Sequence, residues 1–208
     1  MGQTKYLGMK SGDLDGKAYA KYWNPVMQPL QPQVAQAVVH GAEASALGFT
    51  IDQADLLKEP GYLPLENGTT RLETGQIFVA VQTHMPRVTG EMFEWWMGWH
   101  YMENQRYKLW HPQAHLFTQP RFARTDNAGL SDREKYVGNT SYVDEYVGPS
   151  IHRLAIRFQE PRELGLEEQA FAAAGVSTAV CARVGFSDRP VDSGHLIHLM
   201  RDTPDGCE

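Results

Sequence analysis

The spacing of apolar residues divides the chain into short helices and strands. Residues 32–46 and 90–104 carry apolar side chains at helical spacing, and a shorter helix is expected at 166–173. Alternating or β-branched apolar runs predict strands at 75–83, 140–147, 151–158, 176–184 and 194–201. Several antiparallel strands with few helices predict an α+β fold with an antiparallel sheet.

A loop-rich stretch separates the first helix from the rest of the chain. Residues 52–71 are rich in Pro, Gly and Asn, which favour turns over a packed element. We therefore expect a small N-terminal segment over residues 1–70 and a larger domain over residues 71–208. The apolar side of the helix at 32–46 offers a surface for a second copy, so a homodimer is expected.

The end of the chain contains a hairpin signal. Asp205-Gly206 follows the strand at 194–201, and this dipeptide favours a two-residue turn. Because only Cys207 and Glu208 follow, we expect the return strand to be missing or cut off.

Length, charge and cysteine content bound the class of function. With 208 residues, the chain is long enough to bury a domain core. Its net charge of -6 disfavours nucleic acid as a partner. The first residues lack the apolar core of a secretory signal, and no apolar run is long enough to span a bilayer, so we expect a cytoplasmic protein without a membrane partner. Cys181 and Cys207 lie outside any CxxC pattern, which disfavours a thiolate zinc site or a disulfide framework, and Cys181 resembles a buried small hydrophobe. The expected partner is a small molecule or another subunit.

The string WHPQAH holds the first candidate chemistry. His111 and His115 are four residues apart, but Pro112 opposes a helix between them, so the spacing does not predict two helical metal ligands. A histidine ligand needs a carboxylate companion, and Asp144 and Glu145 point to opposite faces if they lie on a strand. Spacing alone leaves open whether His115 and Glu145 bind a metal or are merely polar residues at element ends.

Further aromatic and polar residues have two interpretations each. Tyr107 could donate a hydrogen bond to a polarised carbonyl, or be a rim aromatic. His195 and His198 lie in an apolar strand, where one is expected in the core and the other at a cavity. Four tryptophans at helical spacing favour the core but could also line a pocket for an aromatic ligand: Trp95, Trp96, Trp99 and Trp110. GxGxxG, P-loop, HExxH and GxSxG motifs are absent, which disfavours nucleotide binding, zincins and serine hydrolases.

Taken together, three strings resemble one known family. EWWMGWHYMENQRYKLWHPQAH, NTSYVDEYVG and GHLIHLMRDTPDG are similar to the diacetylphloroglucinol hydrolase family, which includes phloretin hydrolase, from about residue 75 onward. The resemblance implies a zinc (Zn²⁺) enzyme with a catalytic domain of Bet v 1-like, helix-grip shape over residues 71–208. It also implies cleavage of the carbon-carbon bond between an acyl carbonyl and a phloroglucinol-type ring.

The resemblance assigns roles to individual residues. His115 and Glu145 match two of the family's zinc ligands, and Tyr107 matches the tyrosine that contacts the substrate carbonyl. His195 resembles the family's general acid/base histidine. Trp99 and His198 are candidates for further contact with the substrate, an aromatic ketone.

The resemblance also implies a second ligand pair, a His and a Glu four apart near the C-terminus. The sequence ends before such a pair, so we expect a truncated domain whose closing C-terminal helix is also missing. Whether His111, His195 or His198 replaces these ligands stays open.

The expected reaction begins with zinc polarising the acyl carbonyl or activating a water molecule. Tyr107 would support the oxyanion, and His195 would protonate the departing ring carbon. Two alternatives belong to other classes: a non-catalytic module that binds acylphenols or polyketides without zinc, and an inactive truncated homologue. Metal content and retained affinity for acylphenols distinguish the binding module from the enzyme.

Overall fold

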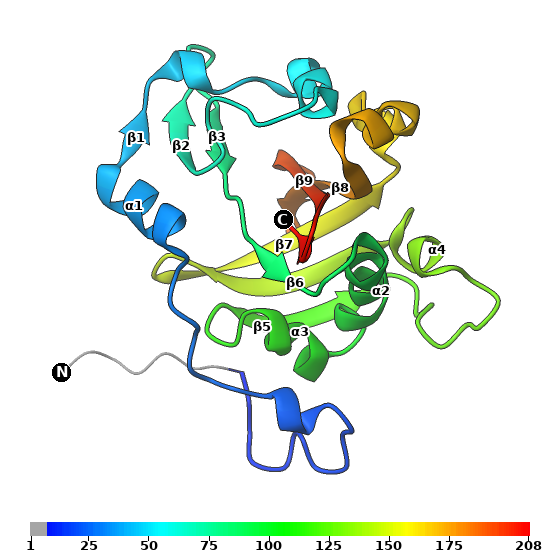
Figure 1. Ribbon diagram of the computed structural model, residues 1–208. Coiled ribbons are helices and arrows are strands. Elements are labelled where there is room, and N and C mark those ends of the chain that lie inside the picture. The colour runs from blue at the N-terminus through cyan, green and yellow to red at the C-terminus, as the bar shows by residue number, and fades with distance from the viewer. Residues whose placement is uncertain (1–7) are drawn as a thin grey trace. The chain divides into compact units, whose positions relative to one another are not determined.

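The computed structural model describes residues 8–208, so residues 1–7 of the predicted N-terminal segment lie outside the described residues (Figure 1). The chain combines helices with mainly antiparallel strands, which confirms the predicted α+β class. Its residues group into two compact units. Of the described residues, the first unit holds 8–28, Glu94–Gln159 and Ala182–Leu196, and the second holds Pro29–Phe93, Glu160–Cys181 and Ile197–Glu208.

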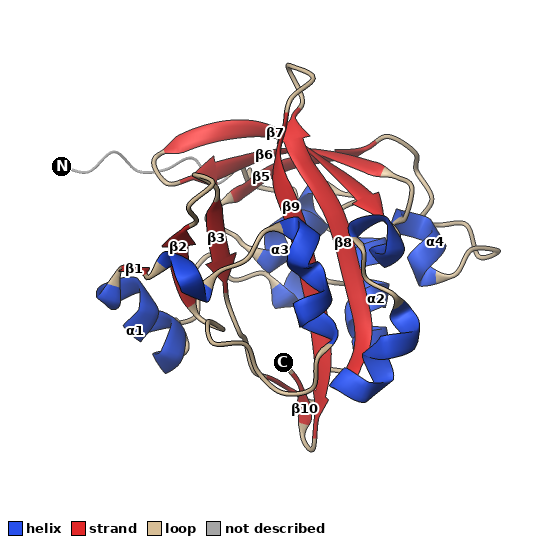
Figure 2. Ribbon diagram, turned by 90° about the horizontal axis from the view of Figure 1, so that it is seen from above, coloured by secondary structure: helices blue, strands red, loops and turns tan. Residues whose placement is uncertain are grey.

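The first unit is built on antiparallel strands with short helices beside them. Its strands are hydrogen-bonded in the order β9-β8-β7-β6-β5, namely parts of β9 (Asp192–Thr203) and β8 (Val176–Phe186), then β7 (Ser150–Gln159), β6 (Thr140–Val147) and β5 (His115–Pro120). Its helices are most of α2 (Gly90–His100), α3 (Asn104–Trp110), α4 (Asp132–Tyr136) and a 3-10 turn at Ala20–Tyr22. Figure 1 shows α3 beside β5, the strand against which it packs, and Figure 2 shows β8 and β9 side by side.

Local sequence explains where these helices begin and end. The predicted helix at 90–104 ends earlier, at His100, and a second helix, α3, begins at Asn104 after Glu103, which is extended, with φ -147° and ψ 137°. α3 stops at Trp110 because Pro112 disfavours a helical conformation at His111, whose φ is -139° and ψ 85°. The turn at His111 then leads directly into β5.

The second unit contains two small groups of strands. β1 (Ala42–Glu43), β2 (Gly68–Arg71) and β3 (Ile77–Ala80) form a sheet in that order, and α1 (Pro32–His40) contacts β2. The other group is formed by the second-unit residues of β8 and β9 together with β10 (Gly206–Cys207) and β4 (Met85–Pro86). These strands are hydrogen-bonded in the order β8-β9-β10-β4. Short 3-10 helices complete the unit: Ser45–Leu47, Ile51–Lys58, Pro161–Leu164 and Glu168–Ala174.

Five further predictions from the sequence need correction. The helix at 32–46 ends at His40, because Gly41 adopts φ 90° and terminates it. The strand at 75–83 is shorter, at Ile77–Ala80, and the helix at 166–173 is a 3-10 helix at Glu168–Ala174. The expected absence of a return strand is wrong, because β10 pairs with both β9 and β4. Thr203 pairs with Gly206, so the turn residues are Pro204 and Asp205.

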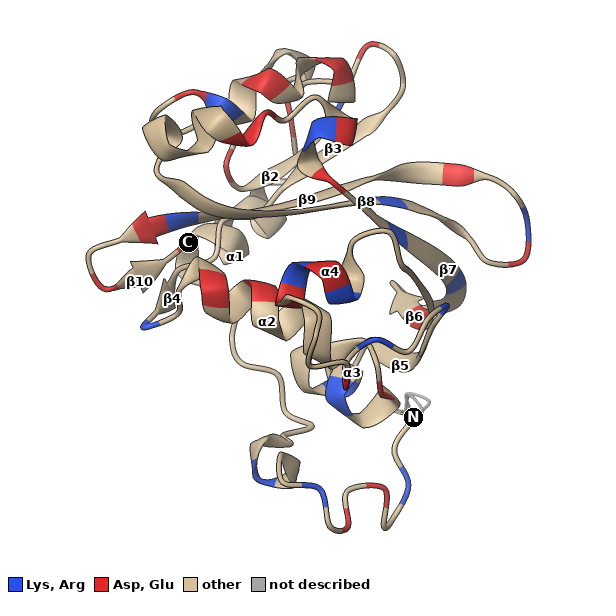
Figure 3. Ribbon diagram, turned by 90° about the vertical axis from the view of Figure 1, so that its right-hand side faces the viewer, with Lys and Arg blue, Asp and Glu red and all other residues tan. Residues whose placement is uncertain are grey.

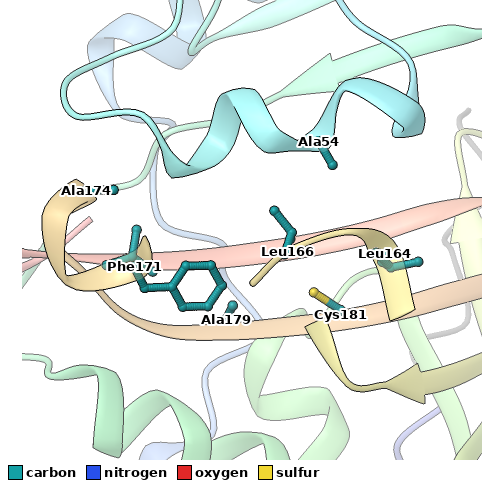
Figure 4. Packing of buried hydrophobic residues seen from close by; sticks show 8 residues of the cluster. Ala54, Leu164, Leu166, Phe171, Ala174, Ala179 and Cys181 are labelled. Carbon is teal, nitrogen blue, oxygen red and sulfur yellow. The ribbon is translucent and has the colours of Figure 1, made fainter. Parts of the chain in front are cut away.

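The core of the second unit lies between the 3-10 helices and β8. Leu166 and Cys181 have no exposed surface, and Phe171 and Ala54 pack in the same cluster (Figure 4). Burial of Cys181 confirms its predicted role as a small hydrophobe. The cluster contains no charged side chain, so its stability comes from apolar burial and close packing.

Replacing Leu166 with alanine is expected to lower the free energy of unfolding by about 2–5 kcal/mol, because a fully buried leucine leaves a cavity. Urea unfolding followed by circular dichroism measures this change. The matched control is Leu56→Ala, at a leucine that is 42% exposed, where a loss of under about 1 kcal/mol is expected. Equal losses in the two variants would contradict the assignment of this core.

Among residues 8–208, none of the helices has the length and apolar character that a bilayer span requires. The predicted pairing surface on α1 is exposed, with Val38 at 69% and Val39 at 88% exposure. The homodimer, the cytoplasmic location and the domain boundary near residue 70 stay predictions.

Candidate functional site

Three of the predicted residues meet in the first unit. Tyr107 comes from α3, His115 is the first residue of β5, and Glu145 lies on β6. His115 and Glu145 are directly opposite each other in the β5-β6 ladder, which brings their side chains close together. The distance from His115 Nε2 to Glu145 Oε1 is 3.8 Å. We call these three residues the trio.

Tyr107 contacts both other members of the trio. Its ring stacks on the His115 imidazole, with 3.9 Å between centroids and 7° between planes. Its backbone carbonyl accepts a hydrogen bond of 2.9 Å from His115 Nδ1, and its hydroxyl donates to Glu145 Oε1. The bond at Nδ1 assigns the proton of the neutral ring to that nitrogen, so the lone pair of His115 is on Nε2, facing Glu145.

Burial sets the protonation of the trio. It lowers the pKa of His115 to about 4, although the Tyr107 carbonyl opposes this shift, so the imidazole is neutral at pH 7. Burial also raises the pKa of Glu145, while the Tyr107 hydroxyl acts in the opposite direction. The pKa of Tyr107 lies well above its ordinary value because of burial and the Glu145 charge. A neutral imidazole beside a desolvated carboxylate is a suitable pair for a divalent cation.

His111 is close to the trio but oriented differently. Its ring centroid is 5.7 Å from that of His115, and its Nδ1 accepts a hydrogen bond of 3.0 Å from the Ala114 N–H. The neutral ring therefore carries its proton on Nε2. This orientation suits a structural neighbour, and whether His111 serves as a ligand stays a prediction.

A buried hydrogen-bond network fixes α3 relative to β5. The Thr118 N–H donates to Asn104 Oδ1 at 2.7 Å, which ties the start of α3 to the middle of β5. The Thr118 hydroxyl donates to the Tyr101 carbonyl at 2.7 Å and shares a hydrogen bond of 2.9 Å with Ser141 on β6. Because unpaired buried polar groups are costly, this network favours one arrangement of the elements that carry the trio.

His100 is a site neighbour that the sequence reasoning missed. It is 3% exposed and stacks between Trp96, at 5.0 Å, and Tyr107, at 5.8 Å. Its Nδ1 donates to the Trp96 carbonyl four residues earlier at 2.8 Å. The signal in the sequence was the spacing of four residues between Trp96 and His100 on a predicted helix, which places the two rings on the same face. The other tryptophans of this helix share that spacing, so His100 did not stand out.

Trp99 is surrounded by other side chains of the first unit. It stacks on Trp95 at 5.3 Å, meets the edge of Tyr19 at 5.4 Å, and has the Arg106 guanidinium 4.6 Å from its ring. These contacts resemble core packing more than an open pocket wall. A role for Trp99 in substrate binding stays a prediction.

The two strand histidines lie in different units. His195 is exposed on the first-unit part of β9, and β8 and β7 lie between it and β6 in the order of the strands. His198 belongs to the second unit, where its ring packs edge-on against Phe93 at 5.6 Å. The structure thus brings Tyr107, His115 and Glu145 together, while the roles of His195 and His198 stay predictions.

Because His198 is buried, we predict that the stability of the protein depends on pH. Burial lowers its pKa to about 4, whereas an unfolded histidine titrates near pH 6.5, so between these values the unfolded chain binds more protons. The contribution of His198 to the free energy of unfolding should therefore fall by up to about 3 kcal/mol as pH drops from 6.5 to 4, with no change above pH 6.5. Urea unfolding at several pH values measures the slope, which His198→Gln should reduce. The control is His40→Gln, at an exposed histidine of the same unit; an equal reduction there would contradict the prediction.

The ligand set for a metal is small. Within residues 8–208, no group of three or more His, Cys, Asp or Glu side chains is arranged to hold a metal ion. His115 and Glu145 are therefore a pair of potential ligands, which is half of a tetrahedral zinc set.

Comparison with known proteins places this site in context. A family model described as the DAPG hydrolase PhiG domain matches residues 48–208, a range that contains the trio. The 2,4-diacetylphloroglucinol hydrolase of Pseudomonas protegens is 34% identical over 196 residues, covering 91% of this chain and 63% of the relative. The enzyme of the same name from Pseudomonas sp is 33% identical over 196 residues, covering 66% of the relative. Phloretin hydrolase of Eubacterium ramulus is 32% identical over 130 residues, covering 62% of this chain and 47% of the relative. The chain thus spans just under two thirds of the length of the two Pseudomonas proteins.

Proposed function

Because the chain belongs to the family of the DAPG hydrolase PhiG domain, as its resemblance predicted, we propose that it is a hydrolase of acylated phloroglucinols. The bond cleaved would be the carbon-carbon bond between the acyl carbonyl and the aromatic ring. The observation that carries the proposal is the cross-strand pair of His115 and Glu145, with Tyr107 in contact with both. We also propose that the domain has the Bet v 1-like, helix-grip arrangement.

We propose zinc as the cofactor, held by His115 Nε2 and a Glu145 oxygen. Zinc-ligand bonds of about 2.0–2.2 Å at tetrahedral angles separate two ligand atoms by roughly 3.3–3.6 Å. The 3.8 Å between these atoms fits this requirement after a small adjustment. Catalytic zinc sites usually have three protein ligands and one open position, so the proposal requires at least one further ligand besides the pair.

When bound, zinc would supply Lewis-acid polarisation of the carbonyl or a more acidic water molecule. The contribution of the chain's own residues follows from the contacts described. Tyr107 keeps its proton, so its hydroxyl is a donor that can stabilise negative charge on an oxygen next to Glu145. The neutral His115 presents a lone pair without first losing a proton.

We propose that a water molecule adds to the acyl carbonyl carbon, and that the bond from this carbon to the ring then breaks while the ring carbon takes up a proton. A carbanion is a poor leaving group, but a phloroglucinol ring accepts a proton on carbon because its hydroxyls permit a keto tautomer. We propose His195 as the donor, since an imidazole can carry a proton near neutral pH and its exposed position allows exchange with solvent. The products would be a carboxylic acid and the deacylated ring.

Metal analysis and product detection test the proposal together. The purified chain of 208 residues should contain zinc in near-stoichiometric amount and convert an acetylated phloroglucinol to acetate and the deacylated ring. Removal of zinc by a chelator should abolish conversion, and added zinc should restore it. If the chain binds acylphenols but does not bind zinc and does not convert the acylphenols, the result would instead support a non-catalytic binding module.

A further inference from the structure

Lys108 is a buried lysine next to the trio that the proposed mechanism does not use. It follows Tyr107 on α3 and has no exposed surface. Burying an ammonium group is costly unless hydrogen bonds compensate the lost hydration. The Lys108 Nζ donates a hydrogen bond of 2.8 Å to the backbone carbonyl of His115. The lysine is therefore bound to the main chain of a proposed metal ligand.

That carbonyl lies at an irregularity in the β5-β6 ladder. His115 pairs with Glu145 but Phe117 pairs with Asp144, so Leu116 is an extra residue and forms a β-bulge. A bulge interrupts the ladder and changes the direction of neighbouring side chains. The hydrogen bond from Lys108 therefore holds the backbone at the point where the direction of the His115 side chain is set.

Gly8 lies close to the ammonium group of Lys108. Its φ is +62°, and a Cβ atom added there would overlap Lys108 Nζ and come within 3.0 Å of the Leu116 carbonyl oxygen. A side chain at this position would thus displace either the ammonium or the bulge. The contact requires glycine both for its φ and for the close approach.

We propose that Lys108, seated against Gly8, is a positioning residue that holds the bulge at Leu116 and so keeps His115 opposite Glu145. The inference rests on the proposed function, because it concerns the proposed metal site. The hydrogen bond from Lys108 goes to a backbone oxygen of His115, so its effect on the side-chain atoms that would hold zinc is indirect.

Two pairs of variants of the full chain test this role. Lys108→Met removes the ammonium, and its control is Lys135→Met on α4, a helix with charges of both signs, where the lysine pairs with Asp132 (Figure 3). Gly8→Ala introduces the overlapping Cβ, and its control is Gly16→Ala. Gly16 has φ +72° but nothing within 4 Å of an added Cβ, so the two glycine variants share the backbone strain and differ in the contact.

The measurements are zinc affinity, by competition with a chelator, and the visible absorption spectrum of the Co²⁺-loaded protein. Lys108→Met is expected to lower zinc affinity by about 10- to 100-fold and to change the Co²⁺ spectrum, as loss of a group that orients a ligand typically does. Gly8→Ala should act in the same direction, while both controls stay within about twofold of wild type. If Lys108→Met does not fold, as judged by thermal melting, the glycine pair decides the question.

Two outcomes would overturn the inference. Wild-type zinc affinity and Co²⁺ spectrum in Lys108→Met or in Gly8→Ala would show that the lysine does not position His115, and would leave the proposed function intact. Absence of zinc binding by the wild-type chain would overturn the proposed function and, with it, the positioning role.

Discussion

His115→Ala and Glu145→Gln are each expected to lower the zinc content of the purified chain and to reduce hydrolysis of an acylated phloroglucinol by at least about 100-fold. Groups that merely orient a metal ligand typically contribute 10- to 100-fold to affinity or activity, so a ligand should contribute at least as much. The two residues face each other across the β5-β6 ladder with 3.8 Å between Nε2 and Oε1, so loss of either leaves a single ligand of the pair. Metal analysis and a kcat/KM measurement on both variants check the prediction.

The neighbouring residues supply matched controls. His111→Ala removes an imidazole whose Nδ1 accepts from a backbone N–H, and Asp144→Asn removes the next carboxylate along β6, which pairs with Phe117. Both controls should retain zinc and activity within a few-fold of wild type. Full activity in His115→Ala, or an equal loss in His111→Ala, would contradict the ligand assignment.

The strands with regular alternation could be predicted from the sequence, and the irregular elements could not. TSYVDEYV was expected at 140–147 and forms β6 at Thr140–Val147. β5 was missed because HLFTQP contains the bulge at Leu116 and ends in proline, so its apolar residues do not alternate. α3 was missed because its preceding break, at Glu103, is set by backbone conformation and not by a Gly or Pro.

Even less of the candidate site than of the fold could be predicted from the sequence. Spacing in the sequence identified His115 and Glu145 as candidates but left a structural interpretation open, because strand register depends on the bulge and on hydrogen bonds such as that from Thr118 to Asn104. Family resemblance selected the pair, and the ladder places the two residues opposite each other. The contacts of Lys108 and His100 depend on tertiary packing, so no local pattern predicted them. The resemblance was recognised from about residue 75, whereas the family match begins at residue 48, in a loop-rich stretch without distinctive strings.

Tyr107→Phe is expected to lower kcat for hydrolysis by about 10- to 100-fold while the chain stays folded. The variant keeps the ring that stacks on His115 and the backbone carbonyl that accepts from its Nδ1, and it removes only the hydroxyl that donates to Glu145. A hydrogen bond to a charged group contributes about 1.5–3 kcal/mol, and loss of that amount from the transition state alone corresponds to roughly this factor in rate. If the hydroxyl also stabilises negative charge on the reacting oxygen, kcat should fall more than KM rises, because that interaction is stronger in the transition state.

The control for this prediction is Tyr142→Phe, at a tyrosine of the same strand as Glu145 that is 38% exposed. It should leave kcat unchanged. Tyr107→Leu separates the two functions of the residue, because it removes the stacking ring as well; it should lower the zinc affinity in addition to kcat. Unchanged kcat in Tyr107→Phe would show that the hydroxyl has no part in the reaction and would leave Tyr107 with only a packing role beside His115.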